Sequence, residues 1–266
     1  MRKFIILFCL LFLSCNYAAG NRTGTVNHDH VIIAHFGDST CMTDYLPPEQ
    51  MVDAILNVRL KAAYKTSKIT NYNLGLSGDS IRVFLDTGRY EHWKNALTGA
   101  LTGIDIAFIR YGSNDMNHRT LSDYQKDLEE LCDRIATDFP GVKIILESNM
   151  YEPWYPDSFN NELNDVWEVA RQVAKTRDYP FVEVFKRLKR EAGVGKKDLC
   201  IRNQSLSLEK FGRRIVDDIV DKEMAKTPDW FKDGHPNYNA VKLIADEELK
   251  LLIALWPKKL PKAAAN

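Results

Sequence analysis

A run of apolar residues, Val31 to Phe36, ends at Gly37 and is followed by an acid and a hydroxyl, Asp38 and Ser39. An unbroken apolar run rich in β-branched residues is typical of a central strand of a parallel sheet, which is buried on both faces. In open α/β sheets, ligands bind beyond the carboxyl ends of such strands. We therefore expect Ser39 to stand where chemistry is done.

Four more short apolar segments follow at the spacing expected for strands that alternate with helices. The expected strands are Ile69–Leu74, Ile104–Tyr111, Val142–Leu146 and Pro180–Phe185. The expected helices run from Pro48 to Tyr64, within Phe84–Leu101, from Leu121 to Phe139, from about Asn161 to Lys175, over much of Lys186–Lys226, and from Tyr238 to Trp256. The segments Thr40–Tyr45, Asn149–Asn161 and Trp230–Asn237 are expected to be loops. This alternation predicts an α/β fold, a three-layer α/β/α sandwich with a five-stranded parallel sheet and right-handed crossovers.

The first residues have the pattern of a targeting segment. Arg2 and Lys3 precede the apolar run Phe4–Leu13, which is too short to span a bilayer comfortably, and small residues at Ala18–Gly20 offer a cleavage site. Cys15 offers a second interpretation, a lipoprotein signal, which is the one route by which we expect membrane attachment. We expect a signal peptide over residues 1–20, an N-terminal arm over 21–30, one domain over 31–256 and a solvated basic tail over 257–266, with cleavage and lipidation both left open.

Charge and cysteine content exclude several classes of protein. The chain has 36 basic and 36 acidic residues, without the clustered basic face of a nucleic-acid-binding protein. Beyond the signal, Cys41, Cys132 and Cys200 lie at wide spacings that fit neither a disulfide framework nor a zinc site, although one bridge among the three stays open.

Four loops carry the residue types of a hydrolase site. They are Gly37-Asp-Ser39, the block Asn73-Leu-Gly-Leu-Ser-Gly78, Gly112-Ser-Asn-Asp115 and the loop at His235. Each motif alone is weak, because such sequences are ordinarily turns and helix caps. Together, in this order and at strand ends, they resemble the blocks of the SGNH hydrolases, also called GDSL-type esterases and lipases. The resemblance extends from about Val31 to the last helix and implies a flavodoxin-like SGNH hydrolase fold.

The chemistry explains why these residue types are needed. A serine hydroxyl is a poor nucleophile until a base takes its proton, and an imidazole near its ordinary pKa of about 6.5 can accept and return that proton. The resemblance implies Ser39 as nucleophile and His235 as base. It also implies an oxyanion hole made of the backbone N–H groups of Ser39 and Gly78 and the side-chain amide of Asn114. No metal and no organic cofactor is expected.

Two features of the chain leave alternatives open. Gly-Asp-Ser occurs twice, so Ser80 rivals Ser39, although the strand before Ser39 is the longer and more apolar. The family's common Asp-x-x-His pattern is also absent, because Lys232 stands three residues before His235. Asp233 is the expected acid, and the alternatives are Asp229 or a Ser–His dyad supported by a backbone carbonyl.

Other polar and aromatic residues near the strand ends have less specific roles. Asp38 is interpreted as a turn carboxylate that holds Ser39 in place. Arg110, at the end of a buried strand, needs either an acidic partner or a substrate group. A packed aromatic loop is the default interpretation of Tyr151, Trp154 and Tyr155, which are also candidates for a wall that stacks on a sugar.

We expect an exported serine esterase that acts on a small-molecule or polysaccharide ester, with a carbohydrate O-acetyl ester as the preferred substrate by resemblance. A lipase, a thioesterase and an acyltransferase of the same fold are alternatives. A carbohydrate-binding surface protein without turnover is an alternative from another class, and its only support is the displaced aspartate.

Overall fold

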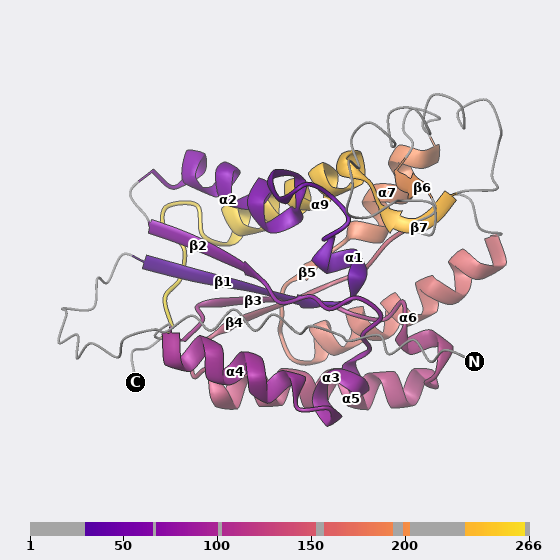
Figure 1. Cartoon of the computed structure of the whole chain (residues 1–266), viewed down its shortest axis with the longest axis horizontal. Helices are drawn as coiled ribbons and strands as arrows, with labels where there is room; N and C mark the ends of the chain where they lie inside the picture. The colour runs from indigo at the N-terminus through magenta and orange to yellow at the C-terminus, as the bar shows by residue number, and fades with distance from the viewer. Residues whose placement is uncertain are drawn as a thin grey trace, which may run out of the picture.

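The computed structural model describes residues 30–65, 68–100, 103–152, 157–193, 199–202 and 232–263. Over these residues the chain forms three layers, a central sheet with helices on both faces (Figure 1). The expected signal peptide, Cys15, Trp154, Tyr155 and Asp229 lie outside the described residues.

The central sheet has five parallel strands in the order β2-β1-β3-β4-β5. Their bounds are β1 His30–Gly37, β2 Lys68–Asn73, β3 Ile106–Arg110, β4 Lys143–Glu147 and β5 Phe181–Val182. The predicted parallel α/β fold is therefore confirmed. β1 lies between β2 and β3, so the carboxyl ends of these three strands meet at one edge of the sheet.

A hydrophobic core lies on each face of the sheet, and successive side chains of β1 point alternately into one core and the other, because a strand has a two-residue period. Ile32, Ala34 and Phe36 pack on one face, while Val31 and Ile33 pack on the other. The first face is covered by α3 Ile81–Asp86, α4 Arg89–Ala100, α5 Leu121–Asp138 and α6 Asp157–Thr176. The second is covered by α2 Val52–Ala63, α7 Val184–Gly193 and α9 Tyr238–Leu255 (Figure 1).

Three segments differ from the sequence-based expectation. A short helix, α1 Ser39–Met42, replaces the loop expected after Ser39, because the Asp38 carboxylate caps it. The last strand of the sheet is short because α7 begins at Val184. The loop expected before the last helix forms a strand, β7 Lys232–Pro236, which pairs antiparallel with β6 Cys200–Arg202.

Smaller features complete the described chain. Two 3-10 turns, η1 Pro48–Gln50 and η2 Asp115–Asn117, precede α2 and α5. The tail is not wholly solvated, because Leu260 is buried and the Lys262 ammonium donates to the carbonyl of His30. Cys41, Cys132 and Cys200 are buried, and none of the three forms a disulfide, so the bridge left open among them is absent. Within the described residues, no helix combines the length and the apolar character needed to cross a bilayer.

Candidate active site

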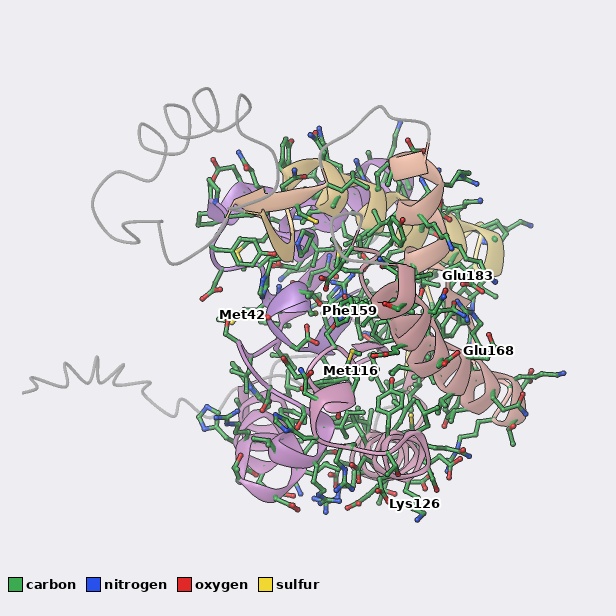
Figure 2. The ribbon with its side chains drawn as sticks, turned by 90° about the vertical axis from the view of Figure 1, so that its right-hand side faces the viewer. Met42, Met116, Lys126, Phe159, Glu168 and Glu183 are labelled. Carbon is green, nitrogen blue, oxygen red and sulfur yellow. The ribbon has the colours of Figure 1, made fainter. Side chains whose placement is uncertain are left out.

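The turn after β1 is packed so tightly that only glycine fits at its start. A Cβ on Gly37 would lie 2.4 Å from the Cβ of Cys41 and 2.6 Å from the carbonyl oxygen of Arg110. The Asp38 carboxylate then accepts the backbone N–H of Thr40 at 2.9 Å and begins α1. These contacts fix Ser39 in the first turn of α1, where it is only 8% exposed. Figure 2 looks onto this carboxyl edge of the sheet.

The structure places an imidazole directly against the Ser39 hydroxyl. The distance from Ser39 Oγ to His235 Nε2 is 2.7 Å, although the two residues are far apart in the chain. His235 is held from several sides: the Tyr45 hydroxyl donates to the carbonyl of Pro236 at 3.0 Å, and the Tyr45 ring contacts the imidazole edge-on at 5.5 Å between centroids. Asn237 caps the start of α9 just beyond it. The pair has the geometry of a nucleophile and its general base.

The acid behind His235 is not identified by the described side chains. The backbone of Asp233 belongs to β7, and its side chain lies outside the described part of the structure, as does all of Asp229. Asp233 therefore stays a prediction.

The loop after β2 is bound to the nucleophile turn through its backbone and through Asn73. The N–H of Leu76 donates to the carbonyl of Gly37 at 3.0 Å. The Asn73 amide donates to the carbonyls of Cys41 at 3.0 Å and Met42 at 3.1 Å, and its oxygen accepts the N–H of Gly75 at 3.1 Å. Asn73 thus ties the end of α1 to the loop that carries Gly78.

Two of the expected oxyanion donors, Gly78 and Asn114, lie in the loops after β2 and β3, the two neighbours of β1. Gly78 has φ +74, a left-handed conformation that favours glycine, with open space where a Cβ would be. The Asn114 amide donates to the carbonyl of Asp79 at 2.8 Å, and its second N–H is not needed for that bond. The carbonyl of Asp79 therefore links the loop of Gly78 to the loop of Asn114.

Ser80 is used differently from Ser39. Its hydroxyl caps α3 by accepting the N–H of Val83, at 3.4 Å. In the described structure the imidazole of His235 bonds to Ser39 and not to Ser80. This placement favours Ser39 over its rival.

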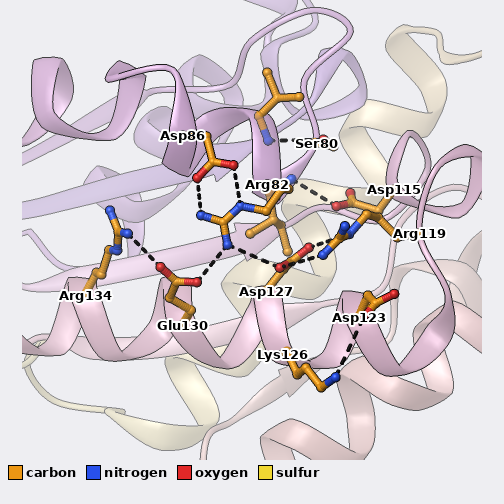
Figure 3. A network of polar contacts seen from close by, with 12 residues as sticks. Ser80, Arg82, Asp86, Asp115, Arg119, Asp123, Lys126, Asp127, Glu130 and Arg134 are labelled. Atoms are coloured by element: carbon orange, nitrogen blue, oxygen red, sulfur yellow. Dashed lines mark hydrogen bonds and ion pairs between the residues drawn. The ribbon is translucent and has the colours of Figure 1, made fainter.

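Two buried acids brace these loops. Asp115 accepts the N–H of Ile81 at 3.0 Å, and burial raises the pKa of its carboxyl to about 7 (Figure 3). Burial also raises the pKa of Asp38, which its bonds to Thr40 partly oppose. Asp127 accepts from Arg119 at 2.8 Å and ties α5 to the preceding loop (Figure 3).

Arg110 and Tyr151 have different surroundings. Arg110 is fully buried, with Nη1 3.6 Å from a Glu147 carboxylate oxygen and 3.9 Å from one of Glu248, so it has the acidic partners that a buried charge requires. Burial raises the pKa of both glutamates. Tyr151 is half-buried and packs edge-on against Phe185.

Three residues at the site were not singled out from the sequence. Asn149, just after β4, donates to Ser113 Oγ at 3.1 Å and to Asp38 at 3.4 Å. Its position at the end of a strand is the sequence feature that could have indicated a role in the site. Tyr45 had no such signal. Glu152 lies so close to β7 that a Cβ on Gly234 would meet its carboxylate at 2.5 Å.

No group of three or more histidine, cysteine or acidic side chains is arranged to hold a metal ion within the described residues. The described site is built instead from a hydroxyl, an imidazole, amides and capping carboxylates.

Comparison with known proteins gives a consistent family. The sequence profile described as the GDSL-like Lipase/Acylhydrolase family matches residues 35–202. No curated protein sequence matches the chain significantly.

Solved structures share the fold at low sequence identity. A member of the lipolytic G-D-S-L family from Veillonella parvula superposes with a TM-score of 0.55 and 18% identity, covering 83% of this chain and 97% of that chain. An α/β hydrolase from the metagenome of Lake Arreo gives 0.58 and 20%, covering 83% and 94%. A variant of an acetyl xylan esterase from Geobacillus stearothermophilus gives 0.58 and 18%, with coverage of 83% and 94%.

Proposed function

Because this chain belongs to the GDSL-like lipase/acylhydrolase family and is an ester-bond hydrolase, we propose that it is an exported serine esterase that removes small acyl groups, above all acetyl, from carbohydrates. The observation that carries the catalytic part is the 2.7 Å contact between Ser39 Oγ and His235 Nε2. The acetyl xylan esterase among the structural neighbours motivates the choice of substrate.

In the proposed first half-reaction, His235 Nε2 takes the proton of the Ser39 hydroxyl as Oγ bonds to the ester carbonyl carbon. The backbone N–H groups of Ser39 and Gly78 and the Asn114 amide would stabilise the negative oxygen of the tetrahedral intermediate. Loss of one such donor typically costs about 10²–10³ in rate. Collapse of the intermediate expels the sugar alkoxide, which leaves as the alcohol by taking the proton from His235.

In the second half-reaction, His235 takes a proton from water as the water oxygen attacks the acyl carbon on Ser39. The intermediate collapses to acetic acid, which ionises to acetate in solution, and His235 returns its proton to Ser39 Oγ. An acid that orients the imidazole stabilises the imidazolium formed in both halves. We assign this role to Asp233 and expect Asp233→Asn to lower kcat by several orders of magnitude. A near-normal rate for that variant would transfer the role to Asp229 or to a backbone carbonyl.

The test of the proposed function compares two serines on one pair of substrates. Purified wild-type protein should release acetate from 4-nitrophenyl acetate and from an acetylated xylo-oligosaccharide. Ser39→Ala should lose both activities, while the matched variant Ser80→Ala retains most of each. Retention of activity in Ser39→Ala, with its loss in a folded Ser80→Ala, would refute the assignment.

Hydrolysis and acyl transfer differ only in the final acceptor, so the same assay separates them. With an unacetylated sugar present, a hydrolase still releases one acetate for each ester cleaved, whereas a transferase yields newly acetylated sugar. We propose hydrolysis.

Export is part of the proposal and rests on residues 1–20. N-terminal sequencing of the exported protein should begin after Gly20 if the signal is cleaved there, or at a lipid-modified Cys15 if the segment is a lipoprotein signal. Retention of Met1 in the mature protein would refute export by either route.

A further inference from the structure

A cavity of about 530 Å³ lies beside the candidate active site, between the loop after β2 and the start of α4. Its volume is within the range of small-molecule sites. Its lining includes Met42, Leu76, Ser77, Arg89, His92 and Trp93. Met42 ends the helix that begins at Ser39, and its side chain is labelled in Figure 2 on the face that carries the carboxyl ends of the strands.

The cavity wall is connected to the groups expected to stabilise the oxyanion. Arg89 donates to the Asp79 carboxylate at 2.5 Å, and Asp79 follows Gly78 directly in the chain. The carbonyl of the same Asp79 accepts the Asn114 amide at 2.8 Å. A group bound in this cavity therefore contacts the loop that carries Gly78 and a residue paired with the anchor of Asn114.

The polar residues of the wall, which also include Asp44 and Thr87, argue against two kinds of occupant. An alkyl chain would have to lie against charged and polar side chains, Arg89, His92 and Ser77, and the desolvation of such groups without hydrogen bonds is costly. An anion would need an unneutralised positive charge. Arg89 is the arginine of this wall, and the fully buried Asp79 carboxylate already neutralises it.

What fits is a neutral molecule with an apolar face and many hydroxyl groups. The Trp93 indole, with the His92 ring edge-on at 5.4 Å between centroids, supplies a flat aromatic surface. The Ser77 hydroxyl, the Arg89 guanidinium and the His92 imidazole supply hydrogen-bonding groups around it. A sugar ring has such a face and such hydroxyls.

We propose that this cavity is the subsite for the sugar alcohol of the ester, with Trp93 as the stacking platform and His92 as a polar contact. This inference rests on the proposed function and adds to it where the leaving alcohol is recognised. It also moves sugar stacking from the candidates Tyr151, Trp154 and Tyr155 to α4.

The test measures whether wall residues affect sugar substrates selectively. Trp93→Ala should raise KM for an acetylated xylo-oligosaccharide about tenfold and leave kcat/KM for 4-nitrophenyl acetate within about threefold, because the small ester does not fill the cavity. His92→Ala, at an exposed position, should raise the same KM about threefold and provides a variant that does not depend on retained packing.

Matched controls lie outside the cavity. Trp256→Ala removes another half-buried tryptophan and His118→Ala another exposed histidine, and neither should change the ratio of the two activities. Equal effects of Trp93→Ala and His92→Ala on both substrates, or effects no larger than those of the controls, would overturn the subsite.

A binding titration distinguishes this inference from the proposed function. The unacetylated xylo-oligosaccharide should bind to wild-type protein and to Trp256→Ala in calorimetry, and much more weakly to Trp93→Ala. Binding of this kind without deacetylation would support the subsite and refute the carbohydrate esterase. Deacetylation unaffected by Trp93→Ala and His92→Ala would refute the subsite alone, and neither binding nor deacetylation would refute both.

Discussion

Replacement of Asn73 by alanine should both destabilise the fold and slow catalysis, because its side chain joins two parts of the site. The amide has two hydrogens within reach of three acceptors, namely the carbonyls of Cys41 and Met42 and a carboxylate oxygen of Asp53 at 3.1 Å. Its oxygen also accepts the N–H of Gly75. At most two donated bonds and one accepted bond are lost together.

At a net 0.5–1.5 kcal/mol for each bond, the loss totals about 1.5–4.5 kcal/mol. Asn73 is half-buried, so water can replace some of these bonds, and we expect a loss of about 2 kcal/mol in the free energy of unfolding. For a chain of this size, the melting temperature should fall by about 4–8 °C. Because α1 and the Gly75–Gly78 loop would no longer be tied together, kcat on 4-nitrophenyl acetate should fall by about tenfold.

The assays are urea unfolding and steady-state kinetics, with Asn71→Ala as the matched control. Asn71 lies two residues earlier on the same strand and donates a long bond of 3.4 Å to the carbonyl of Asp53. If the two variants lose the same stability and the same kcat, Asn73 does not hold the site together and the reasoning is wrong.

Three further changes follow from contacts around the site. Burial raises the Asp115 pKa to about 7, so between about pH 4 and 7 the folded state keeps a proton that the unfolded state loses. The free energy of unfolding should therefore fall by up to about 4 kcal/mol as the pH rises from about 4 to 7. Asp115→Asn should remove this pH dependence in urea unfolding. Tyr45→Phe removes the bond to Pro236 and should cost about 1 kcal/mol in thermal unfolding, with a severalfold lower kcat; an unchanged kcat would show that His235 is held without it. Gly112→Ala places a Cβ 2.3 Å from the Trp167 ring at φ +132 and should cost about 3 kcal/mol or more in chemical unfolding, whereas wild-type stability would contradict the packing.

The parallel fold was predictable because its signals are local. Apolar strands such as Val31–Phe36 and amphipathic helices such as Leu121–Asp138 carry their period in the sequence. The strand around His235 was not predictable, because β7 forms by pairing with β6, which is distant in the chain, and has no alternation of apolar residues of its own. The absence of a disulfide among the three cysteines likewise depends on their positions in the fold.

The sequence predicts which residues form the candidate site better than it predicts the surroundings of each residue. Ser39 and His235 were chosen from motifs, and the fold brings them together. The sequence predicted a buried strand end at Arg110, but the partners of Arg110 and Tyr151 could not be deduced, because Glu248 and Phe185 are distant in the chain. The aromatic surface at Trp93 has no signal in the sequence, because it lies on a helix that carries no catalytic motif.

The central claim is that Ser39, activated by His235, forms the acyl-enzyme. A fluorophosphonate that labels active serine hydrolases, followed by peptide mass mapping, tests it most directly. We predict one label on the peptide that contains Ser39, its loss in His235→Ala, and its retention in Ser80→Ala. A label on Ser80, or a label on Ser39 that persists at the same rate in His235→Ala, would contradict the account.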